Sequence, residues 1–219
     1  MTSYTYLLYE EIGRVARITL NRPEKRNALS NPLRADLFDA LETADADKTV
    51  RVMIIRGAGP SFSAGYDLSA NNNRDRPFYT ARGMATWPHH VIEGCFRMWD
   101  MAKPIIGQVH GFCLAGASEL AAACDLLYVA EDAQIGYPPV RSMSPPDNQF
   151  HTWYIGMRRA MEMMLTGDSI SGKQAADWGF ANAAVPADAL EAHVLMMAER
   201  IAKVPPSIQQ MNKRAVHRQ

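Results

Sequence analysis

The sequence of 219 residues has few of the features that mark specialised classes of protein. It contains only three cysteines, Cys95, Cys113 and Cys124, an odd number without C-x-x-C spacing. All three lie in apolar stretches, so we predict buried thiols in a protein of a reducing compartment, the cytoplasm. The first residues lack a basic segment followed by a long apolar run, and we therefore expect no signal peptide.

Excess charge and long hydrophobic runs are also lacking. Lys and Arg total 23 and Asp and Glu total 23, so the formal net charge is zero, which argues against a broad nucleic-acid-binding surface. No uninterrupted apolar segment approaches the length that spans a membrane. The composition is that of a globular protein, 47% hydrophobic and 21% charged, which excludes disorder, collagen and a coiled coil for the whole chain.

The pattern of apolar residues predicts an α/β fold. Alternation on both sides of a turn at residues 11–14 predicts a β-hairpin, and strands and helices then alternate through the first two thirds. This order is typical of a mainly parallel sheet, and the last third is expected to be a helical layer. The further predicted strands are residues 50–56, 104–109, 125–130 and 134–137, and the predicted helices are residues 32–47, 88–101, 114–124, 149–166, 171–178, 188–203 and 206 onward.

A lone acidic residue stands in an otherwise uncharged segment. Between Lys103 and Asp125, Glu119 is the only formally charged residue, and it lies among small side chains near the start of a predicted helix. Burying an ionised carboxylate without partners is costly. Two interpretations stay open: Glu119 caps the helix N-terminus, or it is a general acid/base whose pKa is tuned by apolar surroundings.

Two turns of small residues follow predicted strands. One contains Ser63–Asp67, and the other ends at Gly116, where a glycine permits close approach of backbone or ligand. One backbone N–H from each turn, aimed at a single point, would form an oxyanion hole. The alternative is that both are ordinary strand-to-helix turns.

Other catalytic motifs do not fit the sequence. Residues 111–116 have the glycine spacing of a phosphate loop, but Ala117 and Ser118 stand where Lys and Ser or Thr are needed, which excludes nucleotide hydrolysis. No G-x-S-x-G nucleophile elbow occurs. His89 and His90 are adjacent and would diverge on a helix, so we expect no metal site there.

Three segments in this order and spacing, NRPEKRNALS, SFSAGYDL and KPIIGQVHGFCLAGASELAAACDLLYVAEDAQIGYP, resemble the crotonase (enoyl-CoA hydratase/isomerase) superfamily. The resemblance runs from about Ile12 to the end. It implies a spiral of ββα units over residues 1–155 and a helical C-terminal region over residues 156–219 that builds homotrimers or hexamers. It also implies an enzyme that acts on acyl-CoA thioesters, as in fatty acid metabolism, and stabilises an enolate-like anion. Coenzyme A enters as part of the substrate, and no metal or redox cofactor is implied.

The resemblance also assigns site residues. The two oxyanion-hole N–H groups fall on Tyr66 and Gly116, and the first catalytic acid falls on Glu119. The basic loop of Lys25 and Arg26 would meet the nucleotide end of coenzyme A, because positive charge suits phosphates. The remaining residues expected to contact coenzyme A or substrate are Ala28, Ala64, Asp67, Leu68, Ser69 and Pro138.

The sequence departs from the superfamily pattern at the second catalytic acid. Pro139 stands where hydratases carry a second glutamate, and a proline cannot transfer a proton, which places hydration by two glutamates in question. Eight residues on, Asp147 occupies a place where dienoyl-CoA isomerases and a dehalogenase branch carry an active aspartate. Two interpretations stay open: Asp147 is a proton shuttle or nucleophile, or it is the N-cap of the following helix.

Length and aromatic content give two further expectations. Members of the superfamily usually continue for a few dozen residues beyond a segment like residues 211–217, so we expect the C-terminal region to be incomplete. Alternative functions are decarboxylation or hydrolysis of an acyl-CoA within the same superfamily, or a catalytically weak CoA-binding assembly protein. The aromatic residues that indicate a roomy acyl pocket are Phe78, Tyr79, Trp87, Tyr137 and Trp153.

Overall fold

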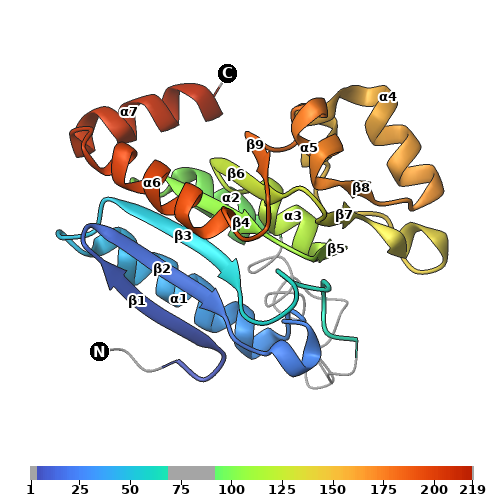
Figure 1. Ribbon diagram of the computed structural model, residues 1–219, viewed down its shortest axis with the longest axis horizontal. Helices are drawn as coiled ribbons and strands as arrows, with labels where there is room; N and C mark the ends of the chain where they lie inside the picture. The colour runs from blue at the N-terminus through green and yellow to red at the C-terminus, as the bar shows by residue number, and fades with distance from the viewer. Residues whose placement is uncertain (1–3, 69–91, 219) are drawn as a thin grey trace.

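The computed structural model describes residues 4–68 and 92–218, which are built around a six-stranded sheet (Figure 1). The strand order is β1-β2-β3-β4-β6-β9. β1 and β2 form the predicted antiparallel hairpin, and all later neighbours in this sheet are parallel, as predicted. The bounds are β1 (Leu7–Ile12), β2 (Val15–Leu20), β3 (Val52–Gly57), β4 (Ile105–Val109), β6 (Leu126–Ala130) and β9 (Ala183–Val185).

A second, three-stranded sheet carries the turn that leads into helix α3. β5 (Phe112–Leu114) pairs in parallel with β7 (Gln134–Gly136), and β7 pairs in antiparallel fashion with β8 (Ile170–Ser171). The sequence pattern predicts only β7 of these three strands. β5, β8 and β9 have two or three residues each, too few for period-two alternation to be recognised.

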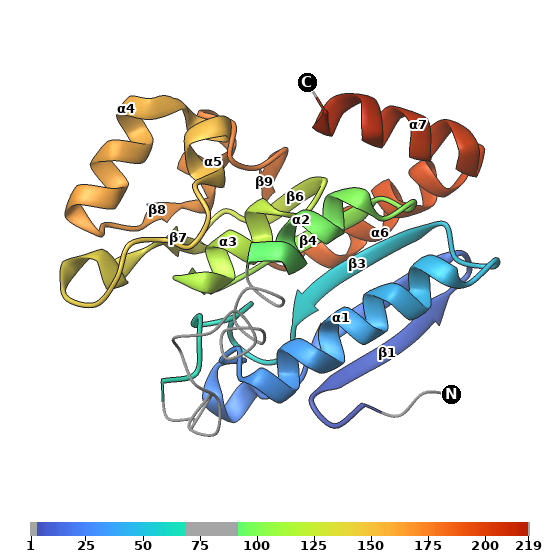
Figure 2. The ribbon, with the colours of Figure 1, turned by 180° about the vertical axis from the view of Figure 1, so that it is seen from behind.

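Helices cover both faces of the large sheet. α1 (Asn31–Ala46) packs on one face and α6 (Leu190–Ala202) on the opposite face, as the two views show (Figures 1 and 2). α1 begins where predicted because Ser30 Oγ accepts the backbone N–H of Leu33 at 3.4 Å and Pro32 suits a first helical turn. The other helices are α2 (Glu93–Asp100), α3 (Gly116–Ala122), α4 (Phe150–Thr166), α5 (Gly172–Trp178) and α7 (Pro206–His217), with short 3₁₀ turns η1 (Pro23–Lys25) and η3 (Pro138–Arg141).

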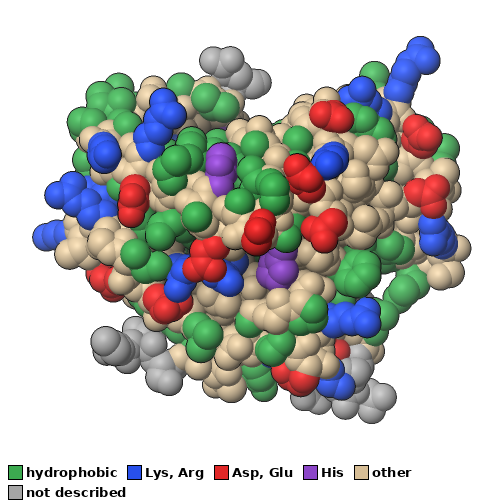
Figure 3. Space-filling view, viewed as in Figure 1, with side chains coloured by type: hydrophobic (Ala, Val, Ile, Leu, Met, Phe, Trp, Pro, Cys, Tyr) green, Lys and Arg blue, Asp and Glu red, His purple; other side chains and the backbone are tan. Residues whose placement is uncertain are grey.

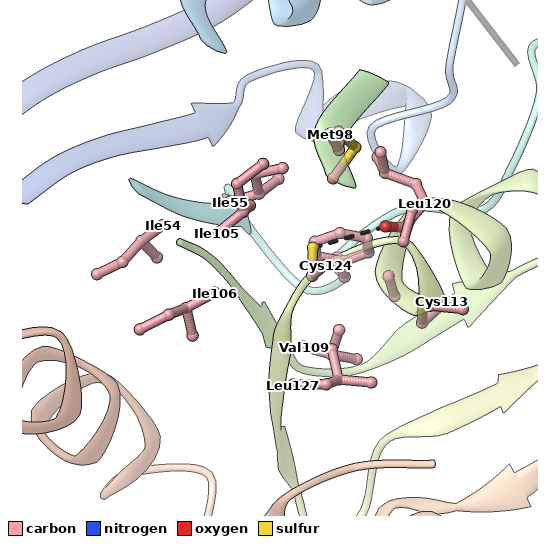
Figure 4. Packing of buried hydrophobic residues seen from close by; sticks show 14 of the residues in the cluster. Ile54, Ile55, Met98, Ile105, Ile106, Val109, Cys113, Leu120, Cys124 and Leu127 are labelled. Carbon is pink, nitrogen blue, oxygen red and sulfur yellow. Dashed lines mark hydrogen bonds between the residues drawn. The ribbon is translucent and has the colours of Figure 1, made fainter. Parts of the chain in front are cut away.

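The core lies on both faces of the central strands. Ile54 and Ile106 are register partners on β3 and β4, and both lie on the side of α6 (Figure 4). Ile55 and Ile105 point to the other side, where Met98 of α2 packs, because successive residues of a strand face opposite ways. The predicted burial of the three thiols is confirmed: Cys95, Cys113 and Cys124 are free and buried.

The expected division at residue 155 lies next to a kink in α4 but does not separate two hydrophobic cores. Gly156, with a φ of +75°, interrupts the helical geometry of α4 at this point. β9, which lies beyond it, completes the large sheet next to β6. Buried residues from both sides of the division belong to one hydrophobic cluster. The C-terminal third therefore shares the core of the preceding residues, and it contributes strands as well as helices.

The surface carries charges of both signs. In the view of Figure 3, Lys and Arg side chains lie among Asp and Glu side chains over the whole visible face. Within residues 4–68 and 92–218, no helix combines the length and the apolar character needed to cross a membrane.

A buried lysine fixes α7 against the rest of the fold. Lys213 Nζ donates to the carbonyl oxygens of Met98 at 2.7 Å and Lys103 at 2.9 Å, and it pairs with the Asp125 carboxylate at 2.8 Å. Removing one partner of a buried ion pair typically costs about 3–5 kcal/mol. Asp125 would keep the Ile105 N–H at 2.7 Å and His217 Nε2 at 2.7 Å, but His217 balances its charge only when protonated. We expect Lys213→Met to lower the melting temperature by about 6–15 °C in a thermal denaturation experiment.

The matched control is Lys203→Met, which removes an exposed lysine at the end of α6. We expect this control to melt within about 2 °C of the wild type. Equal melting temperatures for the two variants would contradict the role assigned to Lys213.

Candidate active site

The two turns predicted to supply backbone N–H groups lie side by side. Ser63 donates its N–H to Phe112 O at 3.0 Å and accepts the N–H of Leu114 at 3.2 Å. Ser63 Oγ also donates to Asn27 O at 2.8 Å. The turn after β3 is therefore joined both to β5 and to the loop that precedes α1.

Gly65 brings the two turns into contact. Its φ of +97° is a conformation that favours glycine. A Cβ at this position would lie 2.7 Å from both Ala115 Cβ and Leu114 O, and 3.5 Å from Gly116 N. Only a residue without a side chain fits here, and the close approach places the residue after Gly65, Tyr66, beside the start of α3.

The Tyr66 ring lies directly on Gly116. A Cβ on Gly116 would come within 2.2–2.6 Å of three ring atoms of Tyr66, so this position also requires glycine. The buried guanidinium of Arg34 lies over the ring with its Cζ 5.3 Å from the ring centroid, and its Nη1 donates to Leu29 O at 3.0 Å. The ring is thereby packed between α1 and the first residue of α3.

Glu119 is buried against the Tyr66 hydroxyl and the segment before α4. The residue is 1% exposed. Its Oε2 accepts the Tyr66 hydroxyl at 3.3 Å, and its Oε1 accepts the backbone N–H of Asn148 at 2.6 Å. Burial raises the pKa of Glu119 to about 8, and the negative charge of Asp147 acts in the same direction, while the hydrogen bonds from Asn148 and Tyr66 oppose the rise.

The contacts of Glu119 bear on its two interpretations. Both carboxyl oxygens accept hydrogen bonds from residues outside α3, although Glu119 lies in the first turn of that helix. A raised pKa in a buried site is typical of groups that transfer protons. The arrangement therefore favours the acid/base interpretation over the helix cap.

Asp147 lies close to Glu119 but not at a helix cap position. The N-cap residue of α4 is Gln149, two positions further on, so the interpretation of Asp147 as the N-cap is wrong. Asp147 is half-buried and lines a cavity. Its segment is held by Tyr137, whose hydroxyl donates to Pro145 O at 3.3 Å.

The cavity beside these residues has a volume of about 510 Å³. It brings together residues from both turns, from η3 and from the segment before α4. Tyr66, Pro139 and Asp147 line this cavity, whereas Glu119 is not among the described residues that line it. The lining consists of Ala64, Tyr66, Asp67, Leu68, Ala115, Tyr137, Pro139, Met143, Ser144 and Asp147.

The loop predicted to meet coenzyme A adjoins the first turn. Lys25 and Arg26 are exposed, and Arg26 O accepts the N–H of Ala64 at 2.9 Å. The Arg22 guanidinium pairs with the Asp67 carboxylate at 2.9 Å and donates to Ala28 O at 3.0 Å. The side chain of Asp67 therefore holds the loop and the turn together.

Only one of the three remaining residues expected to contact coenzyme A or substrate is among the described residues that line the cavity. Leu68 lines the cavity and is exposed, whereas Pro138 opens η3 next to it. Ser69 lies outside the described residues. In residues 4–68 and 92–218, no three or more His, Cys, Asp or Glu side chains lie close enough together to hold a metal ion.

The aromatic prediction holds for one residue and is wrong for another. Tyr137 lines the cavity. Trp153 does not: it is 64% exposed on α4, and its ring packs 5.6 Å from that of Phe150 and 5.5 Å from that of Trp99. Residues 78, 79 and 87 lie outside the described residues, as does the first part of the predicted helix 88–101.

Three contributions to the site are not predicted from the sequence. These are the Tyr66 hydroxyl as a partner of Glu119, the Arg34 guanidinium over the Tyr66 ring, and the Asn148 N–H on Glu119. Arg34 is a charged residue of an amphipathic helix, and such residues are usually expected to face solvent. A backbone N–H is present in every residue except proline, so the sequence does not indicate which one will contact Glu119. Only the fold brings these groups to Glu119.

The raised pKa of Glu119 predicts a pH-dependent stability. In the unfolded chain the carboxyl ionises near pH 4.5, whereas the folded protein keeps its proton up to about pH 8. The stabilisation from this proton is complete below pH 4.5 and is lost as the pH rises to 8. We expect Glu119→Gln to melt close to the wild type at pH 4.5 and about 10–20 °C above it at pH 9. A difference in melting temperature that does not change with pH would contradict the pKa assignment.

Comparisons with known proteins agree with this arrangement. The model of the family described as enoyl-CoA hydratase/isomerase matches residues 10–219. A putative enoyl-CoA hydratase, EchA13, of Mycobacterium tuberculosis is 36% identical over 98% of this chain and 74% of its own length. The mitochondrial enoyl-CoA hydratase of Pongo abelii is 31% identical over the same shares, 98% and 74%.

Solved structures give the same result. An enoyl-CoA hydratase/isomerase from Xanthobacter autotrophicus Py2 superposes with a TM-score of 0.91 at 37% identity, over 99% of this chain and 80% of that one. The fold is thus that of the crotonase-like α/β proteins. The chain belongs to the enoyl-CoA hydratase/isomerase family, which is a family of enzymes.

Proposed function

We propose that the protein is an enoyl-CoA hydratase/isomerase-type enzyme that binds an acyl-CoA thioester oxygen between the N–H groups of Tyr66 and Gly116. The observation that carries the proposal is the contact of the two turns at Gly65, beside a buried carboxyl group. As the first residue of α3, Gly116 has an N–H without an acceptor inside the helix. Preorganised donors of this kind typically contribute about 3–4 kcal/mol each when negative charge develops on the oxygen.

Two carboxyl groups would move the protons. Glu119, whose pKa of about 8 keeps it protonated at neutral pH, supplies a proton at the α-carbon of the enolate. Asp147 lines the cavity and accepts the proton of an attacking water, or of the γ-carbon in an isomerisation. Coenzyme A enters as part of the substrate, with its phosphates near the exposed Lys25 and Arg26.

Pro139 favours a second candidate function within the same family. It lines the cavity at the position of the second glutamate and carries no group that transfers a proton. Decarboxylation of a malonyl-type thioester, in which a C–C bond breaks to give the enolate, needs the oxyanion hole more than a pair of carboxylates. Thioester hydrolysis and a catalytically weak CoA-binding assembly protein remain as further alternatives.

A library experiment tests the proposed function. The purified protein is incubated in D₂O with a mixture of saturated, unsaturated and carboxylated acyl-CoA thioesters, and the products are measured by mass spectrometry. We expect addition of one D₂O to an enoyl-CoA, or a shifted double bond with deuterium gained. Loss of CO₂ would support the decarboxylase instead. Binding of thioesters with no conversion and no exchange would favour the assembly protein.

The finer architecture is part of the proposal. We propose that the strands and helices form the ββα spiral of the family and that copies of the chain assemble as trimers or hexamers. Beyond Gly156, Met157, Met161 and Leu165 form an exposed apolar stripe along α4, and a stripe of this kind is suited to burial against another chain. Light scattering is expected to give three or six times the chain mass of 24.3 kDa, and a monomer would contradict this.

A further inference from the structure

The Tyr66 side chain stands between Glu119 and the cavity. Tyr66 lines the 510 Å³ cavity, whereas Glu119 is 1% exposed and is not part of the lining that the described residues form. The Tyr66 hydroxyl lies 3.3 Å from Glu119 Oε2. Tyr66 therefore adjoins both the cavity and Glu119.

The Tyr66 ring is held in place from two sides. Gly116 lets the ring lie against the backbone of α3, and the Arg34 guanidinium lies over the ring. Arg34 is itself buried and bonded to Leu29 O. The ring cannot swing aside without disturbing these contacts, so the hydroxyl is fixed at Glu119.

The hydrogen bonds of Glu119 place its proton. Oε1 accepts the Asn148 N–H at 2.6 Å, so this oxygen acts as an acceptor. The Tyr66 hydroxyl donates to Oε2 when Glu119 is a carboxylate, and when Glu119 is protonated the proton lies on Oε2 and the same 3.3 Å hydrogen bond runs from Glu119 to the Tyr66 oxygen. Burial raises the pKa of Tyr66 well above its ordinary value, so the phenol stays neutral and has a proton to pass on.

We propose that Tyr66 is a catalytic residue that relays the proton between Glu119 and the α-carbon of the acyl thioester. The inference rests on the proposed function. The electron pair of the enolate forms the new C–H bond with the Tyr66 hydroxyl proton as the O–H bond breaks. Tyr66 regains a proton from Glu119 Oε2, which leaves a carboxylate. In hydration, the water oxygen bonds to the β-carbon and keeps one hydrogen as the new hydroxyl group. Asp147 takes the second proton of the water. Solvent carries this proton back to Glu119 and completes the cycle.

The experiment compares Tyr66→Phe, Glu119→Gln and the double variant. Phenylalanine keeps the ring against Gly116 and Arg34 and removes only the hydroxyl. Deuterium incorporation at the α-carbon of butyryl-CoA in D₂O is measured by mass spectrometry, and butyryl-CoA binding is measured separately by equilibrium dialysis. Tyr128→Phe, on β6 and buried away from the cavity, is the matched control.

We expect each single variant to slow exchange by about 100-fold or more. The double variant should be no slower than the slower single variant within a factor of about three, because both residues act in one step. Binding should stay within about threefold and Tyr128→Phe should exchange like the wild type. Incorporating 3-fluorotyrosine at position 66, whose phenol is a stronger acid and a weaker base, is expected to change the rate of exchange, whereas the midpoint of its pH profile stays with Glu119.

Two outcomes separate the relay from the proposed function. If Glu119→Gln is inactive and Tyr66→Phe exchanges within about threefold of the wild type, the relay is wrong and the proposed function stands. A rate of exchange with 3-fluorotyrosine equal to that of the wild type would overturn the relay in the same way. If the wild type binds butyryl-CoA but neither exchanges it nor converts any thioester of the library, both proposals fail.

Discussion

Glu119→Gln is expected to lower kcat/KM for the converted enoyl-CoA by about 10²–10⁴-fold. Glutamine keeps the size of the side chain and an oxygen for the Asn148 N–H, which Glu119 Oε1 accepts at 2.6 Å. It cannot donate and regain a proton at the α-carbon. Because the substituted side chain remains buried and hydrogen-bonded, we expect the loss in kcat with little change in thioester binding. Steady-state kinetics and equilibrium dialysis measure the two quantities.

The control for this variant is Glu162→Gln, an exposed glutamate on α4. It should retain kcat/KM within about twofold. A decarboxylase that depends on the oxyanion hole alone would keep its activity in Glu119→Gln. Full activity of this variant toward an enoyl-CoA would show that Glu119 has no part in proton transfer.

Gly65→Ala is expected to abolish turnover by separating the two turns. The added methyl group would lie 2.7 Å from Ala115 Cβ and Leu114 O, so the backbone must move. The proposed alignment of the Tyr66 and Gly116 N–H groups on one atom would then be lost. Loss of one donor of an oxyanion hole costs about 10²–10³-fold in kcat, and we expect a decrease of at least this size in kinetics measured below the melting temperature.

Gly156→Ala gives a matched control for the backbone strain. Gly156 also has a positive φ, +75°, but nothing lies within 4 Å of the position that its Cβ would take. Both variants carry the strain of an L-residue at positive φ, of order 1–3 kcal/mol. Only Gly65→Ala should lose activity beyond its loss of stability. Equal activities for the two variants would contradict the account of the two turns.

Much of the fold could be predicted because its elements are long enough to show a period. The strand of residues 50–56 is a run of mostly apolar, β-branched residues, and the helix of residues 32–47 is apolar at helical spacing. Both occur within two residues of the predicted bounds. β9 has three residues and no such pattern, although it completes the large sheet. The division expected at residue 155 does not separate two cores, because β9 joins the last third to the large sheet.

The site could be predicted only in part. Glu119 is identified because one charge in a long uncharged segment requires a partner, and the structure supplies partners in Tyr66 and Asn148. That these partners are 53 and 29 residues away is a property of the turns and not of any local pattern. Asp147 illustrates the opposite case, since a turn after two prolines fits a cap equally well until the start of α4 is known.

Infrared difference spectroscopy tests the proposed hydrogen bonds from the Tyr66 and Gly116 N–H groups to the thioester oxygen most directly. The ligand is bound butyryl-CoA labelled with ¹³C at the thioester carbonyl. Two N–H donors on the oxygen weaken the C=O bond, so we expect the labelled stretch to move to lower frequency on the wild-type protein. Gly65→Ala should bind the same ligand without this displacement. A carbonyl stretch on the wild type at its frequency in water would contradict the account.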